Sequence, residues 1–186
     1  MRVVAGKYGS RPLKAVPGMN TRPTTDKIKE GMFNVLGGYF DGGMCLDFYG
    51  GSGALAIEAV SRGMEHAIIT EKNRAALATI QSNVAMTQEM DKFTILAGDN
   101  RASLQHYKAA HPDLIFDWVL LDPPYKKETL IEDIEWLLEL QVIDEVTSIL
   151  CETDNLTELP DTLLLWQKVK YKEYGQTRIH LYEGSA

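Results

Sequence analysis

The segment Asp122-Pro123-Pro124-Tyr125 carries groups that could hold an amino group in place for chemistry. An amine on a base is a poor nucleophile because its lone pair is delocalised into the ring, so a site that alkylates it must accept both N–H bonds. Asp122 offers a carboxylate and Pro123 a carbonyl oxygen, while the two prolines fix φ and remove competing N–H donors. Tyr125 can stack on a base turned out of its helix or loop. The segment predicts transfer of a group to a base amine, although an ordinary strand-ending turn is the alternative interpretation.

A second cluster, Asp47 with the glycine-rich residues 50–53, predicts a nucleotide-type cofactor. Glycines let the backbone approach a ligand closely, and the helix expected next offers free N–H groups at its N-terminus. The glycine pattern with Glu71 about twenty residues later also fits a dinucleotide fingerprint. Asp47 favours S-adenosylmethionine instead, because a carboxylate here would pair with an ammonium group but repel a pyrophosphate.

Two further carboxylates complete the predicted cofactor site. Glu71 can accept both ribose hydroxyls, since a carboxylate has two acceptor oxygens, and Asp99 can accept from the adenine amino group. The structural alternatives are a surface pair between Glu71 and Lys72, and a helix cap at Asp99. The predicted cofactor-binding residues are Asp47, Tyr49, Gly51, Ser52, Gly53, Glu71, Lys72, Asp99 and Asn100.

These residues follow short apolar runs that alternate with helical stretches. Strands are expected at 44–49, 67–71, 93–97, 118–122 and 148–152, and helices at 54–62, 74–86, 101–109 and 130–140. Nearly continuous apolar strands between helices indicate a parallel sheet that is covered on both faces, with ligands at its carboxyl edge. The runs 163–171 and 177–182 flank Gly175 and predict an antiparallel hairpin at the sheet edge.

The first 40 residues differ from the rest. Extended runs around residues 6–10 predict a β-hairpin, and helix-start residues at 21–26 precede apolar residues at helical spacing. We therefore predict one α/β domain over 1–186. An N-terminal hairpin and helix (1–40) would precede a Rossmann-like class I methyltransferase core (41–186), whose seven-stranded, mostly parallel sheet ends in the antiparallel hairpin.

Charge is unevenly distributed along the chain. The net charge is −7, yet residues 1–30 hold seven basic and two acidic side chains, which leaves 12 basic and 24 acidic for the other 156. A basic N-terminal segment on an acidic protein could bind phosphates locally. A solvent-exposed hairpin and helix face without such a role explains the charge distribution equally well. Cys45 and Cys151 are expected to be core thiols, and the four histidines lack metal-ligand spacing. With no apolar run of about 18 residues and no signal peptide, we expect a cytoplasmic protein without a membrane or metal partner.

At this point the sequence resembles the RsmD-type family of bacterial small-subunit ribosomal RNA guanine-N2 methyltransferases, over nearly its whole length. The resemblance rests on the N-terminal residues 2–6, 9–13, 22–24 and 33–36, on residues 47–63, on the segment 122–125, and on the tail at 174–177. The chain reads Asp-Phe-Tyr-Gly-Gly at 47–51 where the family more usually has Asp-Leu-Phe-Ala-Gly, a change that removes no acceptor.

The resemblance implies transfer of one methyl group to the N2 amine of a guanine, on ribosomal RNA within a partly assembled small subunit. It also implies that Arg2, Arg11, Arg22 and Thr24 lie beside the RNA. The alternatives are a DNA adenine-N6 methyltransferase, an NAD-dependent oxidoreductase, and a noncatalytic ribosome-assembly factor on a methyltransferase fold. The adenine enzyme would normally need a larger target-recognition region than 186 residues can hold.

Overall fold

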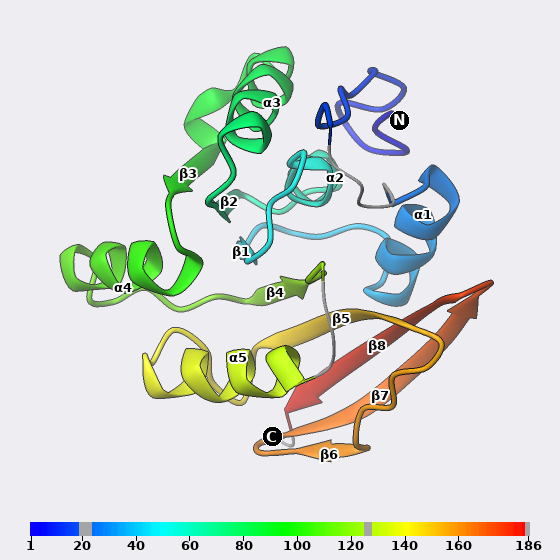
Figure 1. The fold of residues 1–186 in the computed structure, drawn as a ribbon, viewed down its shortest axis with the longest axis vertical. Helices are drawn as coiled ribbons and strands as arrows, with labels where there is room; N and C mark the ends of the chain where they lie inside the picture. The colour runs from blue at the N-terminus through cyan, green and yellow to red at the C-terminus, as the bar shows by residue number, and fades with distance from the viewer. Residues whose placement is uncertain (19–23, 125–127, 185–186) are drawn as a thin grey trace.

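The computed structural model describes residues 1–18, 24–124 and 128–184. Within these residues a single eight-stranded sheet runs through the molecule, in the order β3-β2-β1-β4-β5-β8-β7-β6, with helices on both sides (Figure 1). The strands are β1 (Met44–Asp47), β2 (His66–Glu71), β3 (Phe93–Ala97), β4 (Trp118–Leu121), β5 (Ser148–Asp154), β6 (Thr162–Leu163), β7 (Trp166–Tyr174) and β8 (Thr177–Gly184). The helices are α1 (Asp26–Val35), α2 (Ala54–Ser61), α3 (Arg74–Met86), α4 (Asn100–Ala110) and α5 (Glu128–Glu139), with a 3-10 turn η1 (Met90–Lys92).

The pairing confirms a mostly parallel sheet that ends in an antiparallel hairpin. Strands β3, β2, β1, β4 and β5 are parallel, and β8 and β7 follow in antiparallel order. The predicted count of seven strands is wrong for the described residues, because β6 adds an eighth. Only two residues long, β6 is too short to give a period-two pattern that sequence could reveal.

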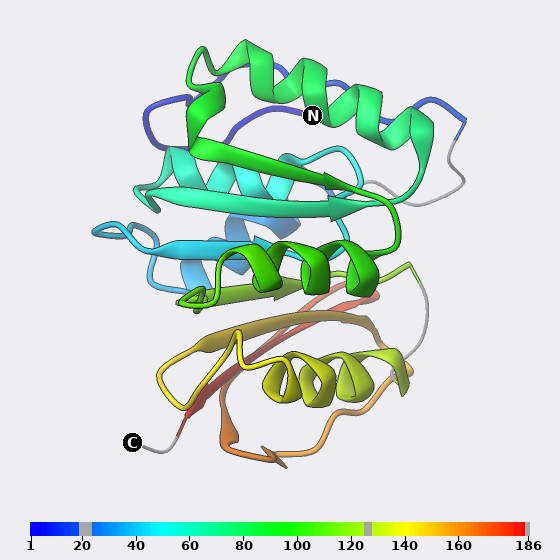
Figure 2. The same ribbon diagram turned by 90° about the vertical axis from the view of Figure 1, so that its left-hand side faces the viewer.

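The sheet separates two hydrophobic cores. One lies between the sheet and α1, α2 and α3, and the other between the sheet and α4 and α5 (Figure 2). Successive strand residues contribute to opposite cores: Cys45 packs on the first and Leu46 on the second. Because both faces are covered, the central strands are apolar at nearly every position. Both cysteines are buried free thiols, which confirms their expected place in the core.

Local side-chain chemistry sets where the helices begin. Thr25 caps α1 by accepting from the Ile28 amide at 3.2 Å, and Asn73 caps α3 through the Ala76 amide at 2.9 Å. Such caps satisfy one of the amide groups that the first turn of a helix leaves without a partner. Helix α2 begins differently: Gly53 precedes it with φ +81° and supplies no side-chain cap.

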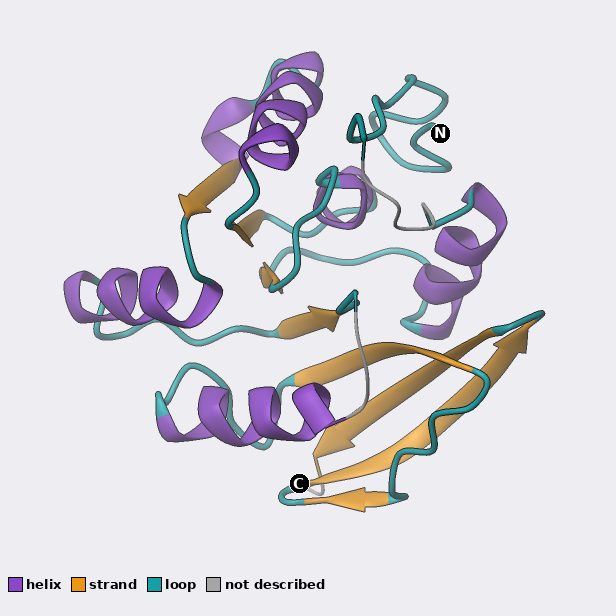
Figure 3. Cartoon of the chain, viewed as in Figure 1, coloured by secondary structure: helices purple, strands orange, loops and turns teal. Residues whose placement is uncertain are grey.

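The predicted N-terminal β-hairpin is reduced to one β-bridge, between Arg2 and Pro12, and residues 1–18 are drawn as loop (Figure 3). Within this N-terminal arm, the Val3 amide donates to the Arg11 carbonyl at 3.0 Å and the Leu13 amide to the Met1 carbonyl at 2.9 Å. The arm also bonds to α2: Lys7 donates its amide to the Ser61 carbonyl at 2.9 Å, and Ser61 Oγ donates to the Ala5 carbonyl at 2.6 Å. The backbone groups of the arm are therefore shared between its own reversal and the end of α2.

Glu58 on α2 joins the N-terminal arm, α1 and α2. Its carboxylate accepts from the amides of Val4 and Ala5, at 2.9 and 3.1 Å, and from Arg62 Nε at 2.8 Å. Lys29 Nζ on α1 approaches the same carboxylate. The basic arm is thereby tied to the core by an ion network that is buried in the protein.

Among the described helices, none has both the length and the apolar character needed to cross a membrane.

Candidate active site

Four carboxylates from four neighbouring strands form a row along the carboxyl edge of the sheet. Glu71, Asp47, Asp122 and Glu152 belong to β2, β1, the end of β4 and β5. The residue pairs Ile69–Asp47 and Asp47–Leu120 are in register, so Glu71 and Asp122 each lie two residues beyond Asp47 on the same face. All four therefore point to the side of the sheet that carries α1, α2 and α3.

The glycine loop between β1 and α2 is held in a tight turn. Gly53 donates its amide to the Gly50 carbonyl at 2.8 Å, and Gly50 donates to the Thr70 carbonyl at 2.9 Å. A Cβ on Gly50 would lie 2.5 Å from Ile69 Cγ2, whereas a Cβ on Gly51 would meet no atom within 4 Å. Asn83 Nδ2 fixes the other side of the loop by donating to the Ser52 carbonyl at 2.8 Å. The loop thus leaves open space above Gly51.

Asp47 lies buried beneath this loop. The Ala56 and Tyr49 amides act on its carboxylate, but no described residue makes a well-aligned hydrogen bond to either oxygen. Burial and the nearby carboxylates of Asp122 and Glu71 raise its pKa well above the ordinary value, while the Ala56 and Tyr49 amides act in the opposite direction. A buried carboxylate without a counter-charge is costly, so this position calls for a cation. The ammonium group of S-adenosylmethionine fits that requirement.

Glu71 reaches across the loop. Its carboxylate accepts from the Gly51 amide at 2.9 Å and from the amides of Lys72 and Asn73, each at 2.9 Å. The contact with Lys72 thus involves its main chain, and the described structure shows no ion pair between the two side chains. Each carboxylate oxygen has two acceptor sites, and these three amides use three of the four, so Oε1 keeps one site for a ribose hydroxyl.

The predicted adenine-side residues have structural partners in this structure. Asp99 caps α4 by accepting from the Ala102 amide at 2.9 Å, and Asn100 Nδ2 donates to the Phe48 carbonyl at 3.3 Å. The Tyr49 hydroxyl donates to Asp133 on α5. The helix cap on α4 is the structural alternative for Asp99. The residue is exposed, and its carboxylate keeps acceptor sites that the Ala102 amide does not use.

The catalytic segment is described through Pro124, and Tyr125 lies outside the described residues. Asp122 directly follows β4 and accepts from Thr24 Oγ1 at 3.3 Å, across 98 residues of sequence. Glu152 on β5 also forms a side-chain hydrogen bond with Asp122, and this partner was missed in the sequence. The rule that found Glu71, a carboxylate at the end of a parallel strand, also applies to Glu152.

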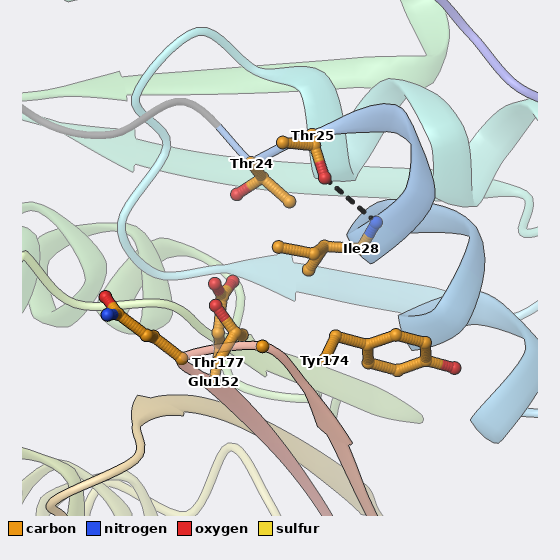
Figure 4. A pocket seen from close by; sticks show the side chains of 8 residues that line it. Thr24, Thr25, Ile28, Glu152, Tyr174 and Thr177 are labelled. Carbon is orange, nitrogen blue, oxygen red and sulfur yellow. Dashed lines mark hydrogen bonds between the residues drawn. The ribbon is translucent and has the colours of Figure 1, made fainter.

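A cavity of about 190 Å³ opens beside this pair of acids. Figure 4 shows Glu152 and Thr177 pointing up from the sheet toward Thr24 and Ile28, with the Tyr174 ring beside α1. Helix α1 and the hairpin of β7 and β8 thus form the walls, and Glu152 lies at the bottom. The N-terminal segment is part of this site.

The four residues expected beside RNA occupy different positions. Thr24 lines the cavity, and Arg2 is exposed beside Asp26, with a nitrogen–oxygen distance of 3.5 Å. The Arg11 guanidinium donates to the carbonyls of Met86 and Thr87 at 3.3 and 3.4 Å, so it closes the end of α3. Arg22 lies outside the described residues.

Residues 1–183 match the model of a protein family described as conserved hypothetical protein 95. The chain belongs to this family. A relative in Bacillus subtilis, named "Putative rRNA methyltransferase YlbH", is 39% identical over 183 residues that span 98% of both chains. Ribosomal RNA small subunit methyltransferase D of Escherichia coli is 28% identical over 186 residues, which cover all of this chain and 91% of the relative.

Solved structures agree with the fold. A conserved hypothetical protein of Streptococcus pyogenes is 40% identical and superposes with a TM-score of 0.76, over 84% of this chain and 95% of the other. The "Putative methyltransferase yhhF from Escherichia coli" superposes with a TM-score of 0.84 at 28% identity, over 100% and 98%. The family members therefore share a Rossmann-like methyltransferase fold.

Proposed function

We propose that this protein transfers the methyl group of S-adenosylmethionine to the N2 amine of a guanine in small-subunit ribosomal RNA. The observation that carries this proposal is the position of Asp122. It lies between the buried, unpaired carboxylate of Asp47 and a cavity that a base could enter. The names of the relatives support an RNA substrate, and the resemblance of the sequence to the guanine-N2 enzymes supports the choice of atom.

The cofactor would be held by three parts of the edge. Asp47 would pair with the ammonium group, Glu71 would accept a ribose hydroxyl, and Asp99 with Asn100 would face the adenine. The uncapped N-terminus of α2 adds free amides for the cofactor carboxylate. When bound, S-adenosylmethionine supplies an electrophilic methyl group.

Asp122 and Pro123 would orient the target amine. The Asp122 carboxylate and the Pro123 carbonyl would each accept one N–H bond, which directs the nitrogen lone pair toward the methyl group. Thr24 holds one oxygen of Asp122 in place. Most of the rate would come from this orientation, because fixing two reactants in line replaces a large entropic cost.

The RNA would approach over the N-terminal arm and α1. Arg2 is exposed for phosphate contact, and Thr24 joins α1 to the acid at the bottom of the cavity. The basic arm would concentrate attraction near the site, while the acidic body limits nonspecific binding. We propose that the RNA is presented within a small-subunit assembly particle in the cytoplasm; the names of the relatives support ribosomal RNA as the substrate.

The test is to incubate the protein with labelled S-adenosylmethionine and small ribosomal subunits that lack methylation, then to digest the RNA and identify the labelled nucleoside. We expect label in N2-methylguanosine, lost in Asp122→Asn and retained in Asp113→Asn, an exposed aspartate in a loop away from the edge. Label in another nucleoside would contradict the choice of guanine N2. Cofactor binding without any label would favour an assembly factor, and full cellular complementation by Asp122→Asn would establish it.

A further inference from the structure

We infer that Glu152 is a positioning residue for the transfer, which shares one proton with Asp122 and holds that carboxylate toward the cavity. The inference rests on the proposed function, because it assigns Asp122 to the target amine. It adds a second acid that neither the sequence motif nor the names of the relatives assign.

Strand register brings the two acids together. Leu121 on β4 pairs with Cys151 on β5, so Asp122 and Glu152 are the next residues along two neighbouring parallel strands. Their side chains form a hydrogen bond. Two ionised carboxylates have only acceptor oxygens, so this bond requires that one of the two carry a proton.

The surroundings favour the proton on Glu152. Burial, with the neighbouring Asp122 carboxylate, raises the pKa of Glu152 to about 9. Burial raises the pKa of Asp122 as well, but the hydrogen bonds from Glu152 and Thr24 oppose that rise. The shared proton therefore lies on Glu152, with Glu152 as the donor and Asp122 as the acceptor.

Among the described residues that line the cavity at Glu152, none is a cation. Thr24 and Thr25 precede α1, which contributes Ile28, and the hairpin contributes Tyr174 and residues 175–177. Of the titratable groups that act on the Glu152 carboxyl, Asp122 from β4 is the principal one, and Asp47 from β1 interacts with Asp122 in turn. The state of Glu152 is thus set by burial and by its partner.

The pair opens to the substrate side. Glu152 Oε2 is buried, and no N–H or O–H donor among the described residues reaches it. The adjoining cavity of about 190 Å³ corresponds to roughly six waters at about 30 Å³ each. Glu152 lines this cavity, so a base that entered it would lie beside the pair of acids.

A pH profile tests the shared proton. Above about pH 9 the wild-type enzyme should lose the Glu152 donor, the two carboxylates should repel, and kcat should fall. Glu152→Gln should keep near-normal kcat at neutral pH, because its amide donates in place of the O–H, and should not show this fall because the amide does not ionise. Any fall caused by titration of the RNA would be the same in both enzymes.

Whereas Glu152→Gln keeps a hydrogen-bond donor for Asp122, Glu152→Ala removes it. We expect kcat at least tenfold below wild type at neutral pH, with the Kd for S-adenosylmethionine and the melting temperature measured alongside to separate positioning from binding and folding. Unchanged kcat in Glu152→Ala would overturn the inference. An alkaline fall in Glu152→Gln equal to that of wild type would also overturn it.

A second readout needs neither substrate nor activity. The infrared difference spectrum between wild type and Glu152→Gln at pH 7 should contain the carbonyl band of a protonated carboxyl group, and this band should disappear above pH 9. If the band is present but the label enters another nucleoside, the proposed function fails and the shared proton stands. If N2-methylguanosine forms but the band is absent, only the role of Glu152 fails.

Discussion

Lys29 Nζ lies 3.4 Å from Glu58 Oε1, and both side chains are fully buried. The same lysine donates to the Arg2 carbonyl at 2.6 Å. Burial lowers the pKa of Lys29, while the Glu58 carboxylate counteracts that effect. One buried ion pair therefore fixes both the basic arm and the helix that forms a wall of the cavity.

Removing Glu58 should unfold this junction first. Glu58→Ala would leave Lys29 and Arg62 buried without their partner, which costs about 3–5 kcal/mol of unfolding free energy. Urea unfolding measures this change, and Glu135→Ala on the exposed side of α5 is the matched helical control. A loss below 1 kcal/mol in Glu58→Ala would show that water reaches the cluster.

Gly31 should be needed for α1 to lie on the hairpin. A Cβ there would lie 2.5 Å from Tyr174 Cζ. Gly31→Ala should therefore destabilise the protein by about 1–3 kcal/mol through overpacking. In a Tyr174→Ala background the same change should stabilise by up to about 1 kcal/mol, because alanine is the better helix former. Thermal unfolding of the four proteins measures the expected change of sign, and the same sign in both backgrounds would refute the contact.

Asp47 should make cofactor binding depend on pH. Its pKa is raised in the free protein, and pairing with an ammonium group favours the charged form. Binding should therefore release a proton below the raised pKa, so affinity should increase with pH until that pKa is passed. Calorimetry in buffers of different ionisation enthalpy measures the released proton. Asp47→Asn should bind the cofactor at least tenfold more weakly and release none.

The same residue should lower stability in the absence of cofactor. A carboxyl group whose folded pKa exceeds its unfolded pKa stabilises most below the unfolded value, and that contribution is lost as pH rises through the folded value. Asp47→Asn should thus raise the melting temperature of the free protein at neutral pH. A lower melting temperature would mean that Asp47 has a partner in solution.

Gly51 should matter for the cofactor more than for folding. Its φ of +57° makes any side chain unfavourable by about 1–2 kcal/mol, yet an added Cβ would meet no protein atom. Gly51→Ala should lower cofactor affinity at least tenfold by filling the space above the loop. Gly18→Ala has a similar φ of +72° and equally open space, so it should share the stability cost and keep the affinity.

Strand-end carboxylates were the most predictable part of the site. Asp47, Glu71 and Asp122 follow apolar runs, and the carboxyl ends of parallel strands must meet at one edge, so sequence alone could place them together. Glu152 obeys the same rule but belongs to no recognised motif. Its pairing with Asp122 depends on which strands are neighbours, and the order of strands is not encoded in any local pattern.

The N-terminal segment was the least predictable part. Its extended runs correctly indicated a reversal of the chain between Arg2 and Pro12, but further partners of its backbone lie on α2, more than 50 residues away. The positive charge of Arg11 is visible in the sequence and suggested a phosphate-binding residue. The carbonyl groups at the end of α3 to which it donates are not visible in the sequence. A local sequence pattern does not reveal hydrogen bonds between residues that are far apart in the chain.

The position of strand β8 in the sheet determines when, during synthesis of the chain, the enzyme could first become active. Although it is the last strand along the chain, it lies inside the sheet between β5 and β7 and contributes Thr177 to the cavity. During synthesis the earlier strands emerge from the ribosome first. A nascent chain that stops before residue 177 would expose the edge of β5 and lack one wall of the cavity. Such a chain could hold its cofactor loop in place and still be unable to accept a base, so the enzyme would become competent only after residues 177–184 have left the ribosome that made them.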